Sequence, residues 1–207
     1  MLYNYLMNNE IEAQFLDINK NEIRAKLESA GGKLINKERI MKRVIFDAGE
    51  HQFIRVRDEG DKVVMTYKNV HNDKSILGTK EVNVIVDDYD RAVEFMKGTH
   101  LNIKAHQETL REEWELNGCE ICIDTWPWIP SFIEVEGPSE EKVWETAAML
   151  DMDKEKAKFG SVDSTYEHYY GVECDEVNLR TPVITFECEP PKWVKRDILA
   201  QIDPTKH

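Results

Sequence analysis

Stretches in which apolar and polar residues alternate recur along most of the chain. Successive side chains on a β-strand point to opposite faces, so each stretch predicts a strand with one apolar and one polar face. The predicted strands are residues 10–16, a strand that ends near residue 46, and residues 51–57, 62–69, 79–86, 112–116, 120–124 and 132–136. The pattern predicts a protein built largely from short strands.

Apolar residues at helical spacing separate some of these strands. Asn19, Asp88 and Ser139 each precede such a stretch, and their side-chain oxygens suit the exposed N–H groups of a first helical turn. Glycines at 31–32 and at 98 end the first two predicted helices. The third helix is followed by a short one that reaches residue 159, so the helices alternate with groups of strands.

Most connections between the predicted strands are short, which favours antiparallel pairing. Asn117-Gly118, between two alternating stretches, is the strongest of these hairpin signals. Many strands have a charged face, and closure of the sheet would place such faces around a polar interior. The predicted fold class is α+β, a closed antiparallel eight-stranded β-barrel with flanking helices.

The last part of the chain has a different character. Pro182, Pro190 and Pro191 interrupt any regular pattern there, although a short helix is predicted near the end. We therefore expect a barrel domain over residues 1–172, and a largely extended C-terminal extension, residues 173–207, that packs on the barrel or trails from it.

Composition narrows the function. The net charge of −13 argues against non-specific binding to nucleic acid, although it allows an anion in a local basic pocket. We find no long apolar run and no signal-peptide pattern, so we expect a cytoplasmic protein without a membrane partner; a homodimer is possible. Cys119 and Cys122 lie three apart on a predicted strand and should face opposite ways, which favours structural thiols over a metal or redox site.

Like-charged residues two positions apart mark three predicted strands: Glu10 and Glu12, Arg55 and Arg57, and Glu134 and Glu136. Each pair shares one face of its strand. A solvated outer face would explain any single pair, but neighbouring like charges are mildly unfavourable, so their recurrence favours a common site. The candidate carboxylates are Glu10, Glu12, Glu81, Asp124, Glu134 and Glu136, and the candidate cations are Lys42 or Arg43, Arg55, Arg57, Lys68 and Arg111. Such a set could supply oxygen ligands for a divalent cation and cations for phosphate groups.

Residues from Glu10 to Tyr170 resemble the CYTH superfamily, the group of class IV adenylyl cyclases and thiamine triphosphatases also called triphosphate tunnel metalloenzymes. The defining motif of that family is Glu-x-Glu-x-Lys on the first strand, which stands here as Glu10-Ile11-Glu12-Ala13-Gln14. Other pieces of the chain match the family in order and spacing: Lys42-Arg43, Phe53-Ile54-Arg55-Val56-Arg57, Thr66-Tyr67-Lys68, Lys80-Glu81-Val82, Arg111-Glu112-Glu113-Trp114, Ile123-Asp124, Phe132-Ile133-Glu134-Val135-Glu136-Gly137 and Ser164-Thr165-Tyr166.

This resemblance implies an eight-stranded tunnel that takes a triphosphate, such as ATP or inorganic triphosphate, together with Mg²⁺ or Mn²⁺. It implies metal ligands at Glu10, Glu12, Asp124, Glu134 and Glu136. It implies phosphate-binding cations at Arg43, Arg55, Arg57, Lys68, Arg111 and Lys158. The catalytic residues would be Glu10, Glu12, Arg57 and Lys68. The attacking group would be water in a hydrolase or the ribose 3′-hydroxyl in a cyclase, and the sequence leaves both open.

The chain departs from the family pattern at a few positions. Gln14 stands where the motif lysine belongs, Asn83 replaces a frequent acidic residue, and Leu110 replaces a frequent basic one. These departures keep an alternative open, a triphosphate- or nucleotide-binding protein with weak or no catalysis. Trp126, Trp128 and Trp193 could stack on a base at the tunnel mouth, but packing on the outside of the barrel is the expected role for such loop aromatics.

Overall fold

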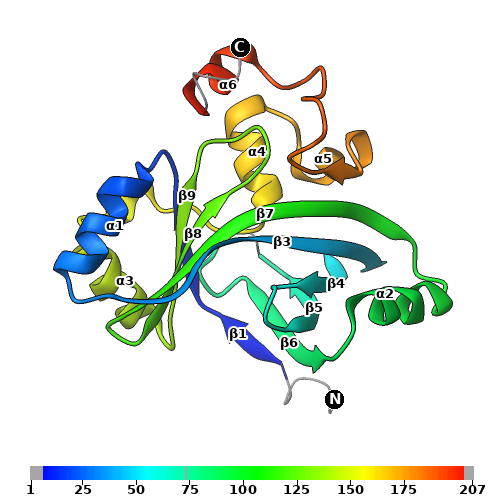
Figure 1. Cartoon of the computed structure of the whole chain (residues 1–207), viewed down its shortest axis with the longest axis horizontal. Helices are drawn as coiled ribbons and strands as arrows, with labels where there is room; N and C mark the ends of the chain where they lie inside the picture. Colours follow the sequence, from blue (N-terminus) through cyan, green and yellow to red (C-terminus); the bar gives the residue numbers. More distant parts are fainter. Residues whose placement is uncertain (1–6, 73, 203–207) are drawn as a thin grey trace.

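A computed structural model describes residues 7–72 and 74–202, and in this part of the chain the strands form one ten-stranded sheet (Figure 1). In chain order the strands are β1 (Asn8–Glu10), β2 (Glu12–Phe15), β3 (Lys33–Gly49), β4 (Gln52–Asp58), β5 (Val63–Val70), β6 (Thr79–Val86), β7 (Ile103–Leu116), β8 (Cys119–Thr125), β9 (Phe132–Glu136) and β10 (Val183–Ile184). Neighbours follow the order β1-β6-β5-β4-β3-β7-β8-β9-β2 and are antiparallel, while β10 lies parallel to β7.

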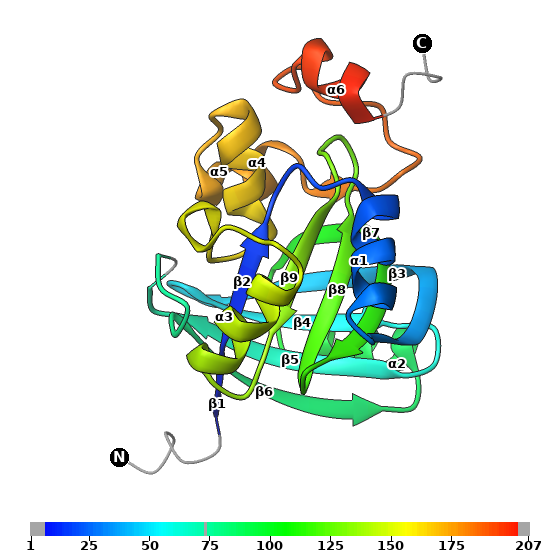
Figure 2. The same cartoon turned by 90° about the vertical axis from the view of Figure 1, so that its left-hand side faces the viewer.

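The two outer strands of this sheet are halves of one stretch of chain, interrupted at Ile11. β1 pairs with β6 and β2 pairs with β9, so the same stretch borders both ends of the sheet (Figure 2). The result is a nearly closed antiparallel barrel, which confirms the predicted fold class. Its wall contains nine strands instead of eight because the first predicted strand is split.

Helices cover the outside of the barrel. They are α1 (Lys20–Ser29), α2 (Tyr89–Gly98), α3 (Glu140–Met149), α4 (Val162–Tyr170), α5 (Cys174–Arg180) and α6 (Arg196–Ile202), with one 3₁₀ turn at Lys154–Lys156. The predicted caps are confirmed, because the side chains of Asn19, Asp88 and Ser139 accept backbone N–H groups at the starts of α1, α2 and α3. None of the helices in the described part of the chain is long and apolar enough to cross a membrane.

Two strands are much longer than the alternation predicts. β3 has 17 residues and β7 has 14, and they pair along most of their lengths despite several register shifts. The prediction missed the first half of β7 because its inward positions, including Gln107 and Thr109, are polar although they are buried. The segment after residue 172 also differs from the extended chain that we predicted, since it contains α5 and β10.

The apolar cores lie between the barrel wall and the helices, which leaves the inside of the barrel to polar groups. Leu27 of α1 and Val143 of α3 belong to one buried cluster, and Met96 of α2 belongs to another. A third cluster joins Tyr166 of α4 to Ile184 of β10, and Trp128 and Trp193 pack in it. These two tryptophans thus pack against the barrel and do not line its interior.

Cys119 and Cys122 are both buried and form no disulfide. Thr146 on α3 donates to Cys119 Sγ at 3.3 Å, whereas Cys122 Sγ donates to Glu120 Oε1 at 3.3 Å. Glu120 lines the barrel interior and Cys119 belongs to the cluster outside it. The two thiols therefore face opposite sides of β8, as predicted, and do not converge on a metal.

Candidate functional site

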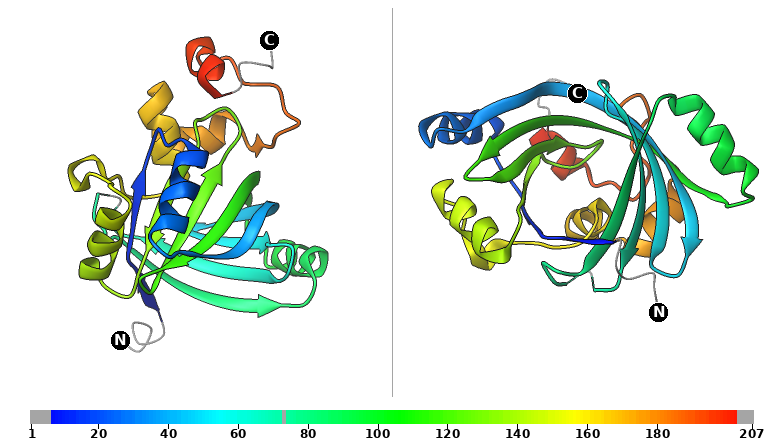
Figure 3. Two further views of the ribbon diagram at one scale, coloured as in Figure 1. Left: turned by 60° about the vertical axis from the view of Figure 1, so that its left-hand side comes forward. Right: turned by 90° about the horizontal axis from the view of Figure 1, so that it is seen from below.

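Figure 3 shows the strands curving around the inside of the barrel. Their inward faces enclose a cavity of about 500 Å³, called the barrel cavity below. Alternation along each strand turns every second side chain into this cavity. The structure brings together almost every site residue predicted from the sequence, because the cavity lining includes Glu10, Glu12, Arg43, Arg55, Arg57, Lys68, Arg111, Asp124, Glu134 and Glu136.

Lys158 is the predicted site residue that lies elsewhere. It is exposed, and it lines a separate surface depression instead of the barrel cavity. Its backbone pairs with that of Gln14 through two hydrogen bonds of 2.9 Å, so it extends the edge of β2. The structure therefore gives Lys158 a place in the wall and not beside the other cations.

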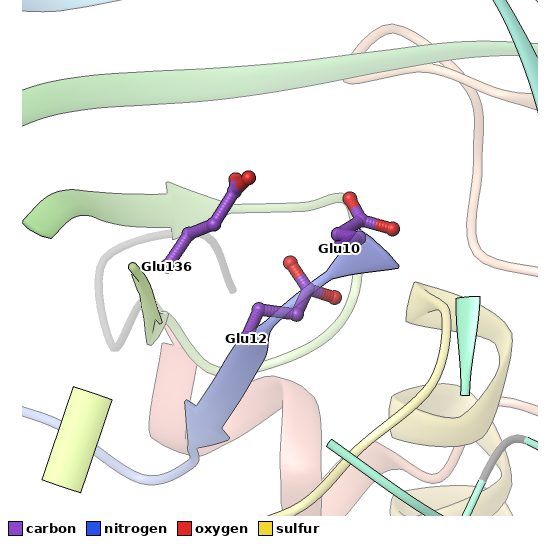
Figure 4. Close-up of side chains that lie close together, drawn as sticks. All are labelled: Glu10, Glu12 and Glu136. Atoms are coloured by element: carbon purple, nitrogen blue, oxygen red, sulfur yellow. The ribbon is translucent and has the colours of Figure 1, made fainter. Parts of the chain in front are cut away.

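Three carboxylates form a cluster on one wall of the cavity (Figure 4). Glu12 on β2 lies opposite Glu136 on β9, and Glu10 comes from β1 just before the break at Ile11. One oxygen from each of these side chains lies within 4.8 Å of the other two. Oxygen ligands at this spacing suit a hard divalent cation such as Mg²⁺ or Mn²⁺.

The acid–base properties of this wall agree with a cation site. Burial, followed by the nearby Glu10, raises the pKa of Glu136 to about 7. The same two causes raise the pKa of Glu12 well above its ordinary value, and burial also raises the pKa of Glu134 in spite of Arg111. Ionising Glu12, Glu134 and Glu136 together is therefore costly without added positive charge, which a bound divalent cation would provide.

Gln14, at the position of the motif lysine, belongs to the same wall. Only 1% of its surface is exposed. Its Nε2 donates to Glu134 Oε1 at 3.1 Å and to the carbonyl oxygen of Gly160 at 2.9 Å. Both partners accept hydrogen bonds, so this orientation of the amide is the one that satisfies them. Gln14 thus holds Glu134 in place without neutralising its charge.

On other parts of the wall, cations are paired with carboxylates. Lys68 pairs with Glu10 and lies 3.3 Å from Glu81, so it connects the acidic cluster to β6. Arg111 Nε donates to Asp124 Oδ1 at 2.7 Å, and the same guanidinium also pairs with Glu134. These ion pairs hold the charged side chains in defined orientations inside the barrel.

Arg57 has a partner that the sequence analysis missed. Its Nε donates at 2.8 Å to Glu59 Oε1, and Glu59 is only 3% exposed although it lies in the turn between β4 and β5. Lys62 lies 3.3 Å from the same carboxylate. The sequence indicated only a tight turn here, because nothing in its composition shows that a turn carboxylate folds back into the barrel.

Arg43 and Arg55 carry the least compensated charges in the cavity. Arg43 is 5% exposed, and its Nε and Nη2 are buried without a hydrogen-bond partner among residues 7–72 and 74–202. Arg55 donates through Nη2 to Thr66 at 3.2 Å, but its Nε also lacks a partner. Burial and the neighbouring arginines lower the pKa of Arg43 well below its ordinary value and that of Arg55 to about 10. Buried guanidinium groups with unused donors suit a multivalent anion.

The remaining departures from the family pattern have separate roles. Asn83 accepts from Thr66 at 2.7 Å and donates to Glu81 at 2.6 Å, so it links two cavity residues in place of a carboxylate. Leu110 neighbours Arg111 on β7 and therefore faces away from the cavity, and it is not among the residues that line it. The change at Leu110 thus leaves the inner surface unaltered.

Comparison with known proteins supports this description. Residues 8–170 match the family model of the CYTH domain. A comparison with curated proteins finds no significant match. Among solved structures, a conserved hypothetical protein from Pyrococcus furiosus is 24% identical with a TM-score of 0.63, over 72% of this chain and 94% of that one.

Two further structures have similar folds at lower identity. A putative adenylate cyclase from Vibrio parahaemolyticus is 9% identical with a TM-score of 0.65, over 76% of this chain and 97% of that one. The putative adenylyl cyclase HpAC1 from Hippeastrum, described as having a dominant triphosphatase activity, is 16% identical with a TM-score of 0.50, over 78% of this chain and 96% of that one. At such identities the likeness shows a shared fold.

Proposed function

Because the chain belongs to the CYTH domain family, we propose that it binds a triphosphate in the barrel cavity and hydrolyses it in a reaction that depends on Mg²⁺ or Mn²⁺. The observation that carries this proposal is the buried, unpartnered guanidinium of Arg43 among other arginines, in a cavity that also holds the Glu10, Glu12 and Glu136 cluster. One cavity therefore offers donors for phosphate oxygens and oxygen ligands for a cation.

We assign the binding of phosphate oxygens mainly to the arginines of the cavity. Arg43 and Arg55 have unused donors and would bind phosphate oxygens first. Arg57 and Arg111 would share their guanidinium groups between phosphate and the carboxylates that they already contact. Lys68 would orient Glu10. Fixed cations around a transferring phosphoryl group stabilise the charge that develops there, and this effect supplies much of the rate in such reactions.

Glu10, Glu12 and Glu136 would hold the divalent cation, and Asp124 and Glu134 contribute further carboxylate oxygens nearby. When bound, the cation neutralises charge on the phosphate oxygens. Glu134 is held by Gln14 and Arg111, so its carboxylate has a fixed orientation from which it could accept a proton from an attacking water.

Two alternatives remain as specific hypotheses. Cyclisation of ATP would use the same cavity with a ribose hydroxyl as the attacking group; the triphosphatase activity attributed to the Hippeastrum protein leads us to favour hydrolysis. The second alternative is binding without turnover, because Gln14 supplies no positive charge at the position of the motif lysine.

The test is an assay of purified protein with ATP and with inorganic triphosphate, with Mg²⁺, Mn²⁺ or a chelator. Release of orthophosphate would support hydrolysis, whereas pyrophosphate together with cyclic AMP would identify a cyclase. Tight binding without product in either assay would favour the binding protein. Failure of the triphosphates to bind would contradict the proposal as a whole.

Two variants tie the assay to the cavity. Arg43→Gln should weaken triphosphate binding by roughly tenfold to a hundredfold, because it removes a charge-assisted donor. The matched control is Arg180→Gln, at an exposed arginine of α5 that pairs with Glu176. Glu12→Gln should raise the Mg²⁺ or Mn²⁺ concentration that any activity requires, because it removes one charged ligand while keeping the side-chain shape.

A further inference from the structure

The residues that line the barrel cavity differ in exposure. Ile35 and Ile85 are 44% and 71% exposed. Gln107, Trp126 and Asn178, which also line it, are all 5% exposed or less. We call the exposed part of the lining, near Ile35 and Ile85, the mouth and the buried part, formed by Gln107, Trp126 and Asn178, the floor.

Asn178 is the part of this floor that comes from outside the matched family region, which ends at residue 170. It lies on α5, whose neighbouring Val177 is completely buried in the cluster that joins the C-terminal segment to the barrel. Burial of Val177 fixes the rotation of this short helix, and Asn178 then faces the cavity. The C-terminal segment is thus part of the cavity wall.

A hydrogen-bonded chain holds Asn178 in this position. Gln107 Nε2 on β7 donates to Asn178 Oδ1 at 3.0 Å, and Asn178 Nδ2 donates to Asp163 Oδ2 on α4 at 2.9 Å. Both amides are almost completely buried, so their orientation is set by these bonds and not by solvent. Strand β7, helix α4 and helix α5 are locked together at the floor.

Two side chains with unpartnered donors among the described residues, Arg43 and Trp126, lie beside this chain of amides. Arg43 is the register partner of Gln107 across the β3–β7 pair, so the two side chains share one face. The Arg43 guanidinium lies over the Trp126 ring at 4.6 Å, and the Nε1 of Trp126 also has no hydrogen-bond partner. Donors without acceptors in a buried floor favour an anionic group at that depth.

We infer that the floor receives the terminal phosphate of the ligand, and that Asn178 sets the depth of the cavity and so the length of the phosphate chain that fits. This inference rests on the proposed function, because it presumes a phosphate ligand. It makes Asn178 a specificity-determining residue that acts through Gln107 and the floor, while the rest of the ligand points toward the mouth near Ile35 and Ile85.

The test measures dissociation constants for pyrophosphate, triphosphate and tetraphosphate by calorimetry, with a chelator present so that the ligands are not hydrolysed. The wild-type protein should prefer triphosphate over tetraphosphate. Asn178→Ala shortens the floor side chain and should reduce this preference by about tenfold, as expected for the loss of a buried polar contact and the space that it leaves. Leu179→Ala, at a residue of the same helix that is 78% exposed, is the matched control and should keep the wild-type preference.

The outcomes separate the two proposals. If the wild-type protein binds none of these phosphates, the proposed function and this inference both fail. If it binds them and Asn178→Ala weakens all three equally, or keeps the wild-type preference, then Asn178 has only a structural role and this inference alone fails.

A second variant covers the case in which Asn178→Ala does not fold. Asn178→Asp keeps the side-chain shape and the acceptor for Gln107, but it loses the donor to Asp163 and adds a negative charge to the floor. It should weaken triphosphate binding by about tenfold and more strongly at low salt, because charges repel less when they are screened. Unchanged triphosphate affinity at low salt in this variant would contradict a terminal phosphate at the floor.

Discussion

Gln14 lies directly opposite Glu134 in the β2–β9 pair, and its amide donates to the Glu134 carboxylate at 3.1 Å. Gln14→Lys would place an ammonium group beside Glu134. It would also lie near Glu12, which is two residues earlier on the same face of β2. We expect the turnover number for triphosphate to rise at least tenfold, because a correctly placed catalytic group is worth about 10² to 10⁴ in rate. Steady-state kinetics with Mg²⁺ measures this.

The control for this change is Gln14→Met, which keeps the length of the side chain but removes both hydrogen bonds of the amide. It should lower or abolish turnover. Equal turnover in Gln14→Lys and the wild-type protein would show that the missing lysine does not limit the reaction.

The raised pKa of Glu136, about 7 against an ordinary 4.5, predicts how stability depends on pH. Between these values the folded state keeps a proton that the unfolded state has released. The free energy of unfolding of the metal-free protein should therefore fall as the pH rises from about 4.5 through 7, by on the order of 1–3 kcal/mol. Urea unfolding at several pH values in the presence of a chelator measures the change.

Glu136→Gln provides the comparison, because its amide resembles the protonated carboxyl. The variant should match the wild-type protein near pH 5 and exceed its stability near pH 8, where the wild-type carboxylate is charged. Added Mg²⁺ should stabilise the wild-type protein at pH 8 more than the variant, since the variant lacks one ligand of the cluster. The same pH profile in both proteins would rule out Glu136 as the titrating group.

The ion pair between Glu59 and Arg57 should stabilise the fold but weaken the binding of triphosphate. Glu59→Gln removes the charge that holds Arg57 and should lower the free energy of unfolding by about 1–3 kcal/mol. The same change leaves the Arg57 guanidinium available to phosphate, so triphosphate should bind more tightly. Urea unfolding and calorimetry measure the two effects.

Asp61→Asn is the control for Glu59→Gln, because Asp61 lies in the same turn and its side chain is 57% exposed. It should change neither stability nor affinity by more than about 0.5 kcal/mol. Weaker triphosphate binding in Glu59→Gln would mean that Glu59 orients Arg57 for the ligand and does not compete with it.

The boundary that we predicted near residue 172 can be tested through Ile184, which is completely buried on β10 and pairs with Gln107 of β7. Ile184→Ala should lower the free energy of unfolding by about 2–5 kcal/mol in a single transition, because the C-terminal segment shares a core with the barrel. Val183→Ala, at a residue that is 41% exposed, is the control. Two separate transitions would show that the segment unfolds on its own.

The strands with clean alternation and the caps of the main helices could be predicted from the sequence, because these features depend on local periodicity and on side chains near the backbone that they cap. The charged inner face could be predicted in the same way. Glu10, Glu12, Arg55, Glu134 and Glu136 were predicted from spacing along single strands, and closure of the sheet placed them in one cavity. The local pattern is enough to predict that a side chain faces the cavity, because this requires only that its strand turn that face inward.

Which charges are paired and which are not could not be predicted, because it depends on how distant segments pack together. Glu59 folds into the barrel from a turn, Asn178 arrives from a helix after the family region, and Lys158 is left outside, although its charge matched the other cations. Each outcome depends on contacts between segments far apart in the chain, such as the 3.0 Å bond between Gln107 and Asn178. A sequence pattern shows which face of an element a side chain lies on, but its partner across space is fixed by packing.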